Sequence, residues 1–192
     1  MRVFFIVLVL FFSFQSWSSA DDIRDFQIEG ISVGDSALDF FSESEIKKNS
    51  KNYFKDKRYT PVQNNNMSFF KTYDAVDFIF KSNDKNYIIK SLSGILVYEK
   101  NIKDCYKRMD EIVTEMDVIF SNQKKFPKRN YKHRNDKSGK SKITDVEYSF
   151  KNGSSVVIAC YDYSEEHGSQ DHLSISLDSK EIDDFFSSNP YD

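Results

Sequence analysis

The sequence contains few of the residues, and none of the short motifs, from which many catalytic sites are built. Only two cysteines and three histidines occur among its 192 residues. There is no Cys-x-x-Cys pair, which argues against a redox-active dithiol, and no phosphate-binding glycine loop or Walker motif. No set of paired inward carboxylates stands out either. We therefore expect neither an enzyme nor a bound cofactor.

Long apolar runs are also scarce, and the one that occurs lies at the start of the chain. Residues 3–12 read VFFIVLVLFF, which is too short for the roughly 20 residues of a membrane span but suits a secretory signal. Ser18 and Ala20 offer small side chains to a signal peptidase, so we predict cleavage after Ala20. An uncleaved N-terminal anchor is the alternative. No cysteine lies near this point, which argues against a lipoprotein, and no transmembrane segment is expected after cleavage.

The chain that remains after residues 1–20 is long enough to form one domain, residues 21–192, with its own core. Cleavage removes only Arg2 from the charge count, so 26 basic side chains stand against 30 acidic ones. This balance favours solubility and argues against nucleic acid as a partner.

The clearest element of the sequence is an amphipathic helix that follows Asn101, a candidate N-cap, and ends near Phe120. Its apolar residues are spaced three and four apart, as one helical face requires. They are Ile102, Cys105, Met109, Ile112, Met116 and Ile119. This stripe covers less than three heptads, which favours contact with a core over a coiled coil.

The segments before this helix give patterns of different strength. Residues 73–80 and the strand that begins near residue 86 flank the turn KSNDK and predict a hairpin, whose second strand continues through a bulge or bend at Gly94. We also expect a short strand at residues 25–33 and a helical region in two pieces at residues 36–48. An irregular arm is expected at residues 49–66, and a basic polar connection follows the long helix at residues 121–142.

The C-terminal part is expected to contain another strand and a short helix. Leu173, Ile175 and Leu177 line one face of the strand, and Asp178 with Glu181 can begin the helix. Successive hairpins, without strand–helix–strand repeats throughout, favour an α+β fold. We predict a mostly antiparallel sheet whose one face is packed by the long helix and by short N- and C-terminal helices.

The register of the hairpin at Asn152-Gly153 decides which side chains face the core. A two-residue loop sets Tyr148 opposite Val157, whereas a loop that includes Lys151 sets Tyr148 opposite Val156. A one-residue slip exchanges the two faces of a strand, so burial should select the register. The three-residue loop gathers the larger apolar set, and we therefore predict it. The set is Val146, Tyr148, Val156, Ile158 and Cys160.

This register places both cysteines where the sheet meets the long helix. Cys105 lies on the inner face of the helix and Cys160 on the inner face of the sheet. In an exported protein, two cysteines predict one disulfide. Two buried free thiols are the alternative.

The residues Gly34-Asp35-Ser36 resemble the first block of the GDSL-type (SGNH) hydrolases, in which the serine attacks an ester. The resemblance implies an esterase-like hydrolase that uses Ser36. That family also has an Asp-x-x-His pair, but no histidine here follows an aspartate by three positions, and the Gly-x-Asn-Asp block is missing. Helix capping by Asp35 or Ser36 explains the same residues. Further on, Ser42 with Glu45 fits a capping box at another helix start.

Two further stretches contain candidate binding residues. His167, Asp171 and His172 offer nitrogen and oxygen donors to a divalent metal ion within residues 165–172. A solvated loop is favoured there, because no helical spacing fixes these side chains. The connection after the long helix is basic and contains Lys124, Lys125, Lys128, Arg129, Lys132 and Arg134. Such a patch can meet an anionic membrane surface or an acidic polymer, although a solvated loop is the commoner outcome.

Residues 30–42 follow the pattern G-x-S-x-G-D-S-x-L-D-x-F-S. The pattern is similar to that of a family of small exported bacterial proteins, which implies export but no particular activity. A looser likeness is to outer-membrane assembly lipoproteins, in which a Gly–Ser turn opens a helix before a β-meander, but their lipobox cysteine is absent. We therefore favour a non-enzymatic, periplasmic binding protein, whose partner is an envelope protein, an anionic surface or a small ligand.

Overall fold

A computed structural model describes residues 22–65, 69–99, 101–134 and 136–191. The predicted signal peptide and its cleavage site lie outside these residues.

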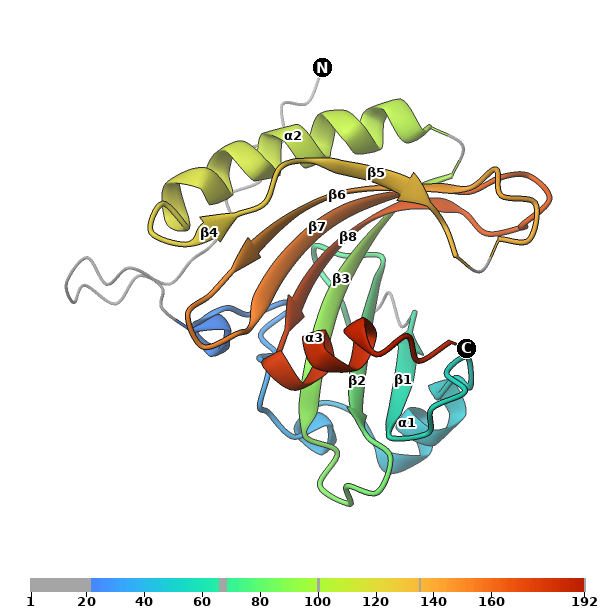
Figure 1. The fold of residues 1–192 in the computed structure, drawn as a ribbon. Coiled ribbons are helices and arrows are strands. Elements are labelled where there is room, and N and C mark those ends of the chain that lie inside the picture. The colour runs from blue at the N-terminus through green and yellow to red at the C-terminus, as the bar shows by residue number, and fades with distance from the viewer. Residues whose placement is uncertain (1–21, 66–68, 100, 135, 192) are drawn as a thin grey trace.

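The described chain forms one antiparallel eight-stranded sheet in the order β1-β2-β3-β8-β7-β6-β4, with β5 also paired to β6 (Figure 1). The strands are β1 (Tyr59–Asn64), β2 (Ala75–Lys81), β3 (Ile89–Glu99), β4 (Lys124–Lys125), β5 (Arg129–Lys132), β6 (Lys142–Ser149), β7 (Ser155–Asp162) and β8 (Asp171–Asp178). The helices are α1 (Glu43–Asn49), α2 (Ile102–Ile119) and α3 (Lys180–Ser187), and the α+β class is confirmed.

The predicted register between β6 and β7 is confirmed. Tyr148 pairs with Val156, Val146 with Ile158, and Cys160 with Thr144. The three-residue loop closes with a backbone bond from the Phe150 N–H to the Ser154 carbonyl. Gly153 has φ +83° in this loop, a left-handed conformation that glycine adopts without steric cost.

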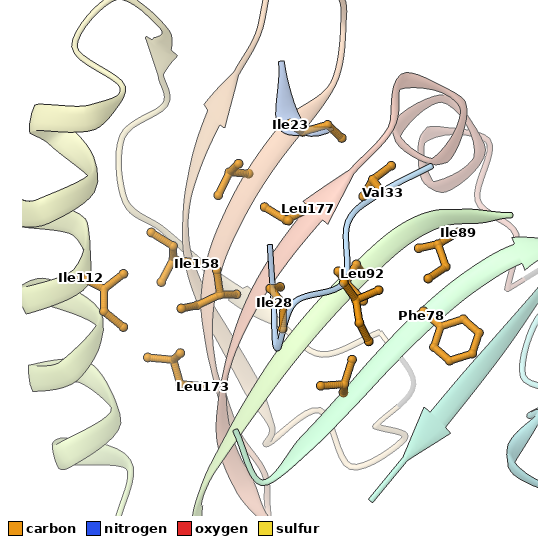
Figure 2. Close-up of a cluster of buried hydrophobic side chains, with 14 of the residues drawn as sticks. Ile23, Ile28, Val33, Phe78, Ile89, Leu92, Ile112, Ile158, Leu173 and Leu177 are labelled. Carbon is orange, nitrogen blue, oxygen red and sulfur yellow. The ribbon is translucent and has the colours of Figure 1, made fainter. Parts of the chain in front are cut away.

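The face of the sheet that this register creates packs against α2. Figure 2 shows Ile112 of α2 pointing toward Ile158 and Leu173 of the sheet. Cys105 is fully buried on the same side of the helix and is bonded to Cys160, 55 residues later, which confirms the predicted disulfide. The helix therefore joins the sheet through both apolar contacts and a covalent link. No helix in the described ranges is long and apolar enough to cross a membrane.

The N-terminal segment covers the rest of this face, but not as the strand predicted at residues 25–33. Within residues 25–33, the one β-bridge joins Ile28 to Ile31 across a tight turn. Glu29 and Gly30 in that turn have φ +54° and +82°, so the segment folds back on itself. The Glu29 carboxylate accepts hydrogen bonds from the backbone N–H groups of residues 71–73. Ile28 can then point into the core, toward Leu92 (Figure 2).

The prediction that all helices pack on one face is wrong, because α3 lies on the face opposite α2 (Figure 1). Phe185 of α3 packs on Tyr59 of β1, with ring centroids 4.7 Å apart. Ser155 of β7, whose neighbour Val156 faces α2, donates a hydrogen bond to Asp183 of α3 at 3.0 Å. The helix also begins one residue later than predicted, with Ser179 as the N-cap. Asp178 instead belongs to the buried end of β8.

The predicted irregular arm at residues 49–66 and the basic connection at 121–142 both contain strands. β1 lies at one edge of the sheet, where Pro61 is tolerated because its missing N–H faces away from β2. The Pro61 carbonyl accepts from the Lys51 N–H at 2.8 Å. At the other edge, β4 and β5 both pair with β6. Edge strands of this kind have no apolar alternation of their own, which is why the sequence pattern did not reveal them.

The helical region predicted before β1 does form two short pieces. A 3-10 turn covers Ala37–Asp39, and α1 follows it. The prediction of a bulge or bend at Gly94 is wrong, because the register shifts of β3 lie at other positions. Gly94 pairs regularly with Val76 and Ile175, and a Cβ atom there would lie 2.5 Å from the ring of Tyr73. Glycine is needed at this position for a close approach, not for a bulge.

We expect loss of the Cys105–Cys160 bond to lower the free energy of unfolding by about 4 kcal/mol, because the bond closes a 55-residue loop in the unfolded chain. Urea unfolding of the oxidised protein and of a Cys105→Ala/Cys160→Ala double variant would measure the difference. A reducing agent should destabilise the wild type and leave the double variant unchanged. Alkylation of two free thiols in the exported, unreduced protein would contradict the disulfide.

A candidate ligand-binding face

The face of the sheet opposite α2 has small side chains across its middle. Strand alternation turns this set away from the apolar core on α2, and Ser93 and Ser176 are hydrogen-bonded to each other at 2.8 Å. The small residues are Ala75, Ser93, Ala159, Ser174 and Ser176. Two larger side chains lie among them, since Ile95 pairs with Ala75 and Ser174, and Val157 pairs with Ser176.

One margin is an aromatic cluster that contains all three histidines of the chain. Tyr161 at the end of β7 stacks on His172 of β8, with ring centroids 4.5 Å apart. Tyr163 stacks on His167 at 4.6 Å and lies 6.0 Å from Tyr161. His133, which follows β5, lies 5.2 Å from Tyr163. Residues from three parts of the sequence thus form one continuous group of rings.

Two of the imidazoles in this cluster are in surroundings that disfavour their charged form. Burial lowers the pKa of His172, and burial together with the nearby His167 lowers that of His133. The Nδ1 atom of His133 is buried and has no hydrogen-bond partner among the described residues. The Nδ1 atoms of His167 and His172 lie 3.0 and 3.1 Å from the Ser169 hydroxyl and the Gln170 carbonyl.

A second aromatic margin lies where the chain before β1 meets the C-terminal residues. The N–H groups of Lys55 and Asp56 both donate to the Pro190 carbonyl, at 2.9 and 3.2 Å. These bonds hold Tyr191 beside Phe54, with ring centroids 5.3 Å apart. Tyr53 contacts the same phenylalanine at 5.9 Å and is 43% exposed.

Asp77 of β2 is on the same face of the sheet as Ser93. It pairs across the sheet with Gln63 and Ser93, and the Gln63 amide donates to its carboxylate at 3.3 Å. Burial raises the pKa of Asp77 to about 7. Its charge acts on both Tyr53 and Tyr163 and contributes to raising the pKa values of these tyrosines, after the larger effect of burial. Both margins are therefore within electrostatic reach of one carboxylate.

The phenol groups around Asp77 are not used in hydrogen bonds between described residues. This holds for the hydroxyls of Tyr53, Tyr161, Tyr163 and Tyr191, all of which keep part of their surface exposed. We call the surface formed by Tyr53, Asp77, Tyr161, Tyr163, His172 and Tyr191 the tyrosine face. It combines ring surfaces and unpaired polar atoms, which is the usual composition of a ligand site.

Two aspartates with raised pKa values lie where α3 packs on the sheet, Asp178 at the end of β8 and Asp183 on α3 itself. Burial raises the pKa of Asp178 to about 6. Burial and the charge of Asp178 raise the pKa of Asp183 to about 7. One carboxylate oxygen of Asp178 is buried without a hydrogen-bond partner in the described chain. When ionised, these two aspartates therefore lower the stability of the folded protein where α3 packs on the sheet.

The structure gives Ser36 bonds to backbone atoms. Its hydroxyl donates to the Asn86 carbonyl at 2.7 Å and accepts from the Leu38 N–H at 3.3 Å, as an N-cap does. Ser36 bridges to Ile88, whereas His172 pairs with Val97. Those two positions are nine residues, or about 30 Å, apart along β3. No imidazole of the described chain is therefore placed to activate this serine.

Other residues singled out in the sequence also have structural partners. Asp35 accepts from the Ser32 N–H at 2.8 Å. Ser42 and Glu45 form both halves of a capping box at the start of α1. Of the candidate metal ligands, Asp171 accepts from the Tyr163 N–H, and His167 and His172 belong to the aromatic cluster. No group of three or more side chains in the described ranges could hold a metal ion.

The basic patch lies on β4, β5 and the adjoining loops, and much of its charge is neutralised locally. Lys125 pairs with Asp117 at 2.7 Å, and Lys128 pairs with Asp110. Arg129 bridges Asp145 and Glu147 of β6. Lys124 lies over the ring of Phe126, and Arg134 donates to Asn189, while Lys132 is exposed on β5.

Sequence reasoning did not identify the tyrosine face. The register of β7 could have indicated part of it, since Tyr161 and Tyr163 alternate with the buried Cys160 and so point away from α2. Nothing in the sequence indicates that Tyr53, Asp77 and Tyr191 lie near them.

Comparison of the chain with known proteins gives no guide to its function. No known protein family, curated protein or solved structure matches the chain.

We expect Asp183→Asn to stabilise the protein by about 1–2 kcal/mol at pH 8. The folded state keeps a proton on Asp183 where the unfolded state has lost it. Its contribution to stability is therefore fully present below about pH 4 and is lost as the pH rises through about 7. Urea unfolding between pH 5 and 8 should show a flatter pH dependence in the variant.

Asp184→Asn is the matched control, because Asp184 is an exposed neighbour on α3 that pairs with Lys180. An exposed pair of this kind contributes little to stability, so this variant should keep the pH dependence of the wild type. Equal effects of the two substitutions would contradict the role given to burial.

Proposed function

We propose that this protein is an exported binding protein of the bacterial envelope that works without catalysis and holds a small ligand on the tyrosine face. The observation that carries the proposal is the group of tyrosine rings on this face, whose solvent-accessible hydroxyls have no hydrogen-bond partner in the described chain. Such rings combine apolar contact area with groups that can form hydrogen bonds. A small ligand can use both at once.

The position of the charges favours a small ligand over an anionic surface. Lys125, Lys128 and Arg129 already have carboxylate partners. The cost of breaking these pairs would reduce any gain from binding a negatively charged surface. The esterase alternative has less support, because Ser36 is bonded to backbone atoms and lies far from the histidines.

The binding proposal predicts that the protein, purified gently from its producing cells, carries a small molecule. Native mass spectrometry should show an added mass that disappears on denaturation. Tyr163→Leu, which removes a ring of the tyrosine face, should lower the occupancy several-fold. The control Tyr106→Leu changes a half-buried tyrosine of α2, on the other side of the sheet, and should leave occupancy unchanged.

The same preparation tests the enzyme alternative. Ser36→Ala should retain the bound molecule, because Ser36 is not part of the tyrosine face. Hydrolysis of a short-chain aryl ester that disappears in Ser36→Ala would contradict the proposal. So would a wild-type protein that carries no bound molecule and takes none up from a low-molecular-weight extract of the same cells.

Export predicts a mature protein that begins at Asp21. N-terminal sequencing of protein from the periplasmic fraction should read Asp-Asp-Ile-Arg. The one tryptophan of the chain is Trp17, so the cleaved protein should show tyrosine fluorescence and no tryptophan emission. A cytoplasmic protein that retains Met1 and Trp17 emission would contradict export.

A further inference from the structure

A hollow of about 630 Å³ lies where β1 begins and β2 ends, and it opens to solvent. One wall is formed by residues 56–59, which lead into β1, and the other by residues 81–83, which leave β2. Figure 1 shows these two strands side by side at one edge of the sheet. The hollow shares no residue with the tyrosine face, so it is a separate candidate site.

Hydrogen bonds hold the two walls of the hollow together. The Ser82 N–H donates to the Arg58 carbonyl at 3.0 Å, and the hydroxyls of Ser82 and Thr60 are hydrogen-bonded at 2.8 Å. Tyr59 pairs with Lys81 across the two strands. A ligand would therefore find the walls already in place, and little of its binding energy would be spent on ordering a loop.

The lining of the hollow carries more positive than negative charge. Lys57, Arg58 and Lys81 are basic, and Asp56 is the one acidic side chain that lines it. Asp56 is paired with Arg58 at 2.7 Å and also accepts from the Arg58 N–H at 3.0 Å. The positive charges of the two lysines therefore have no counter-charge within the lining.

Lys57 has no anionic partner in the described chain. Its ammonium group donates to the side-chain carbonyl of Asn52 and to the backbone carbonyl of Phe54, and both of these acceptors are neutral. These two bonds fix the end of a side chain that is otherwise flexible. An ammonium group has three donors, so one remains for a ligand in the hollow.

Lys81 shares its carboxylate partner with a second lysine. Glu181 of α3 lies 2.6 Å from Lys81 and 3.4 Å from Lys90, so one negative charge serves two ammonium groups. The other acidic side chain of this turn, Asp84, does not line the hollow and accepts two backbone N–H groups. Positive charge therefore remains around the hollow after these pairs have formed.

Neutral donors complete the lining. The side-chain amide of Asn83 has no hydrogen-bond partner among the residues that the structure describes, and the Ser82 hydroxyl is bonded only to that of Thr60. A phosphate monoester has three strongly accepting oxygens and a charge of about −1.5 to −2 at pH 7, whereas a carboxylate has two oxygens and a smaller charge. Phosphate therefore uses this set of donors more fully.

We propose that the hollow binds a phosphate group, which Lys57 and Lys81 hold from opposite walls while Ser82 and Asn83 donate hydrogen bonds to its oxygens. Arg58 stays on Asp56 and closes the lining. The phosphate is bound and released without any covalent step. This second site goes beyond the proposed function and does not depend on a ligand on the tyrosine face.

Heteronuclear NMR on the unmodified exported protein tests the site directly. Titration with inorganic phosphate at low ionic strength should give saturable shifts with a dissociation constant of about 1 mM or lower. The largest shifts should belong to the amides of residues 57, 58, 82 and 83. Sodium chloride should weaken binding, because it screens exposed charges. The absence of saturable shifts, or shifts centred on other residues, would overturn the proposal.

Variants of opposite expected sign guard against misfolding. Lys57→Gln should weaken phosphate binding about fivefold, the most that one exposed charge usually contributes. Glu181→Gln should tighten it about threefold, because Lys81 and Lys90 lose their shared counter-charge. A misfolded protein would not bind phosphate more tightly.

Lys107→Gln is the matched control, because it removes one exposed positive charge from α2 on the other side of the sheet. This variant should bind phosphate as the wild type does. Weaker binding in Glu181→Gln, or equal weakening in Lys107→Gln and Lys57→Gln, would show that no specific site exists.

Two further probes identify the source of the phosphate group. Glycerol 3-phosphate represents a small metabolite, and phosphatidylcholine vesicles with or without phosphatidic acid represent a lipid headgroup. Binding of either probe that is lost in Lys57→Gln and retained in Tyr163→Leu would support the hollow as the site. Binding that is lost in Tyr163→Leu and retained in Lys57→Gln would overturn the proposal and leave the tyrosine face as the binding site.

Discussion

The pairing register of β6 on β7 determines what each side of this molecule can do. The left-handed loop at Gly153 sets Tyr148 opposite Val156, and every later pair in the hairpin follows from that. A shift by one residue would turn Cys160 away from α2 and bring Tyr161 against the apolar core. The disulfide and the tyrosine face therefore both depend on the observed register.

The two faces of the sheet differ in how completely their side chains are satisfied. On the α2 face, apolar residues pack together and the cysteine pair fixes the helix. On the opposite face, three aspartates have raised pKa values, namely Asp77, Asp178 and Asp183. Each keeps a carboxyl group in surroundings that penalise its charge, which lowers stability near neutral pH. Natural proteins commonly retain such local costs at sites that serve a function.

The sequence allowed some parts of the structure to be predicted because those parts are determined locally. The 3-4 spacing of apolar residues in α2 and the Asn152-Gly153 turn belong to single continuous segments, and both formed as expected. β1 and β5 were missed because an edge strand is stabilised by its partner and needs no apolar alternation. The tyrosine face was missed for a similar reason. Tyr53, Asp77, Tyr163 and Tyr191 come from four separate segments, and only the strand order and the path of the C-terminal residues bring them together.

The final residues described in the chain connect parts of the molecule that the sheet keeps apart. The Pro190 carbonyl is bonded to the segment beside the β1 edge, and Asn189 accepts from Arg134 near the β5 edge. Removal of these few residues would abolish both contacts at once and take away the Tyr191 ring. The α2 face and its disulfide have no part in these contacts.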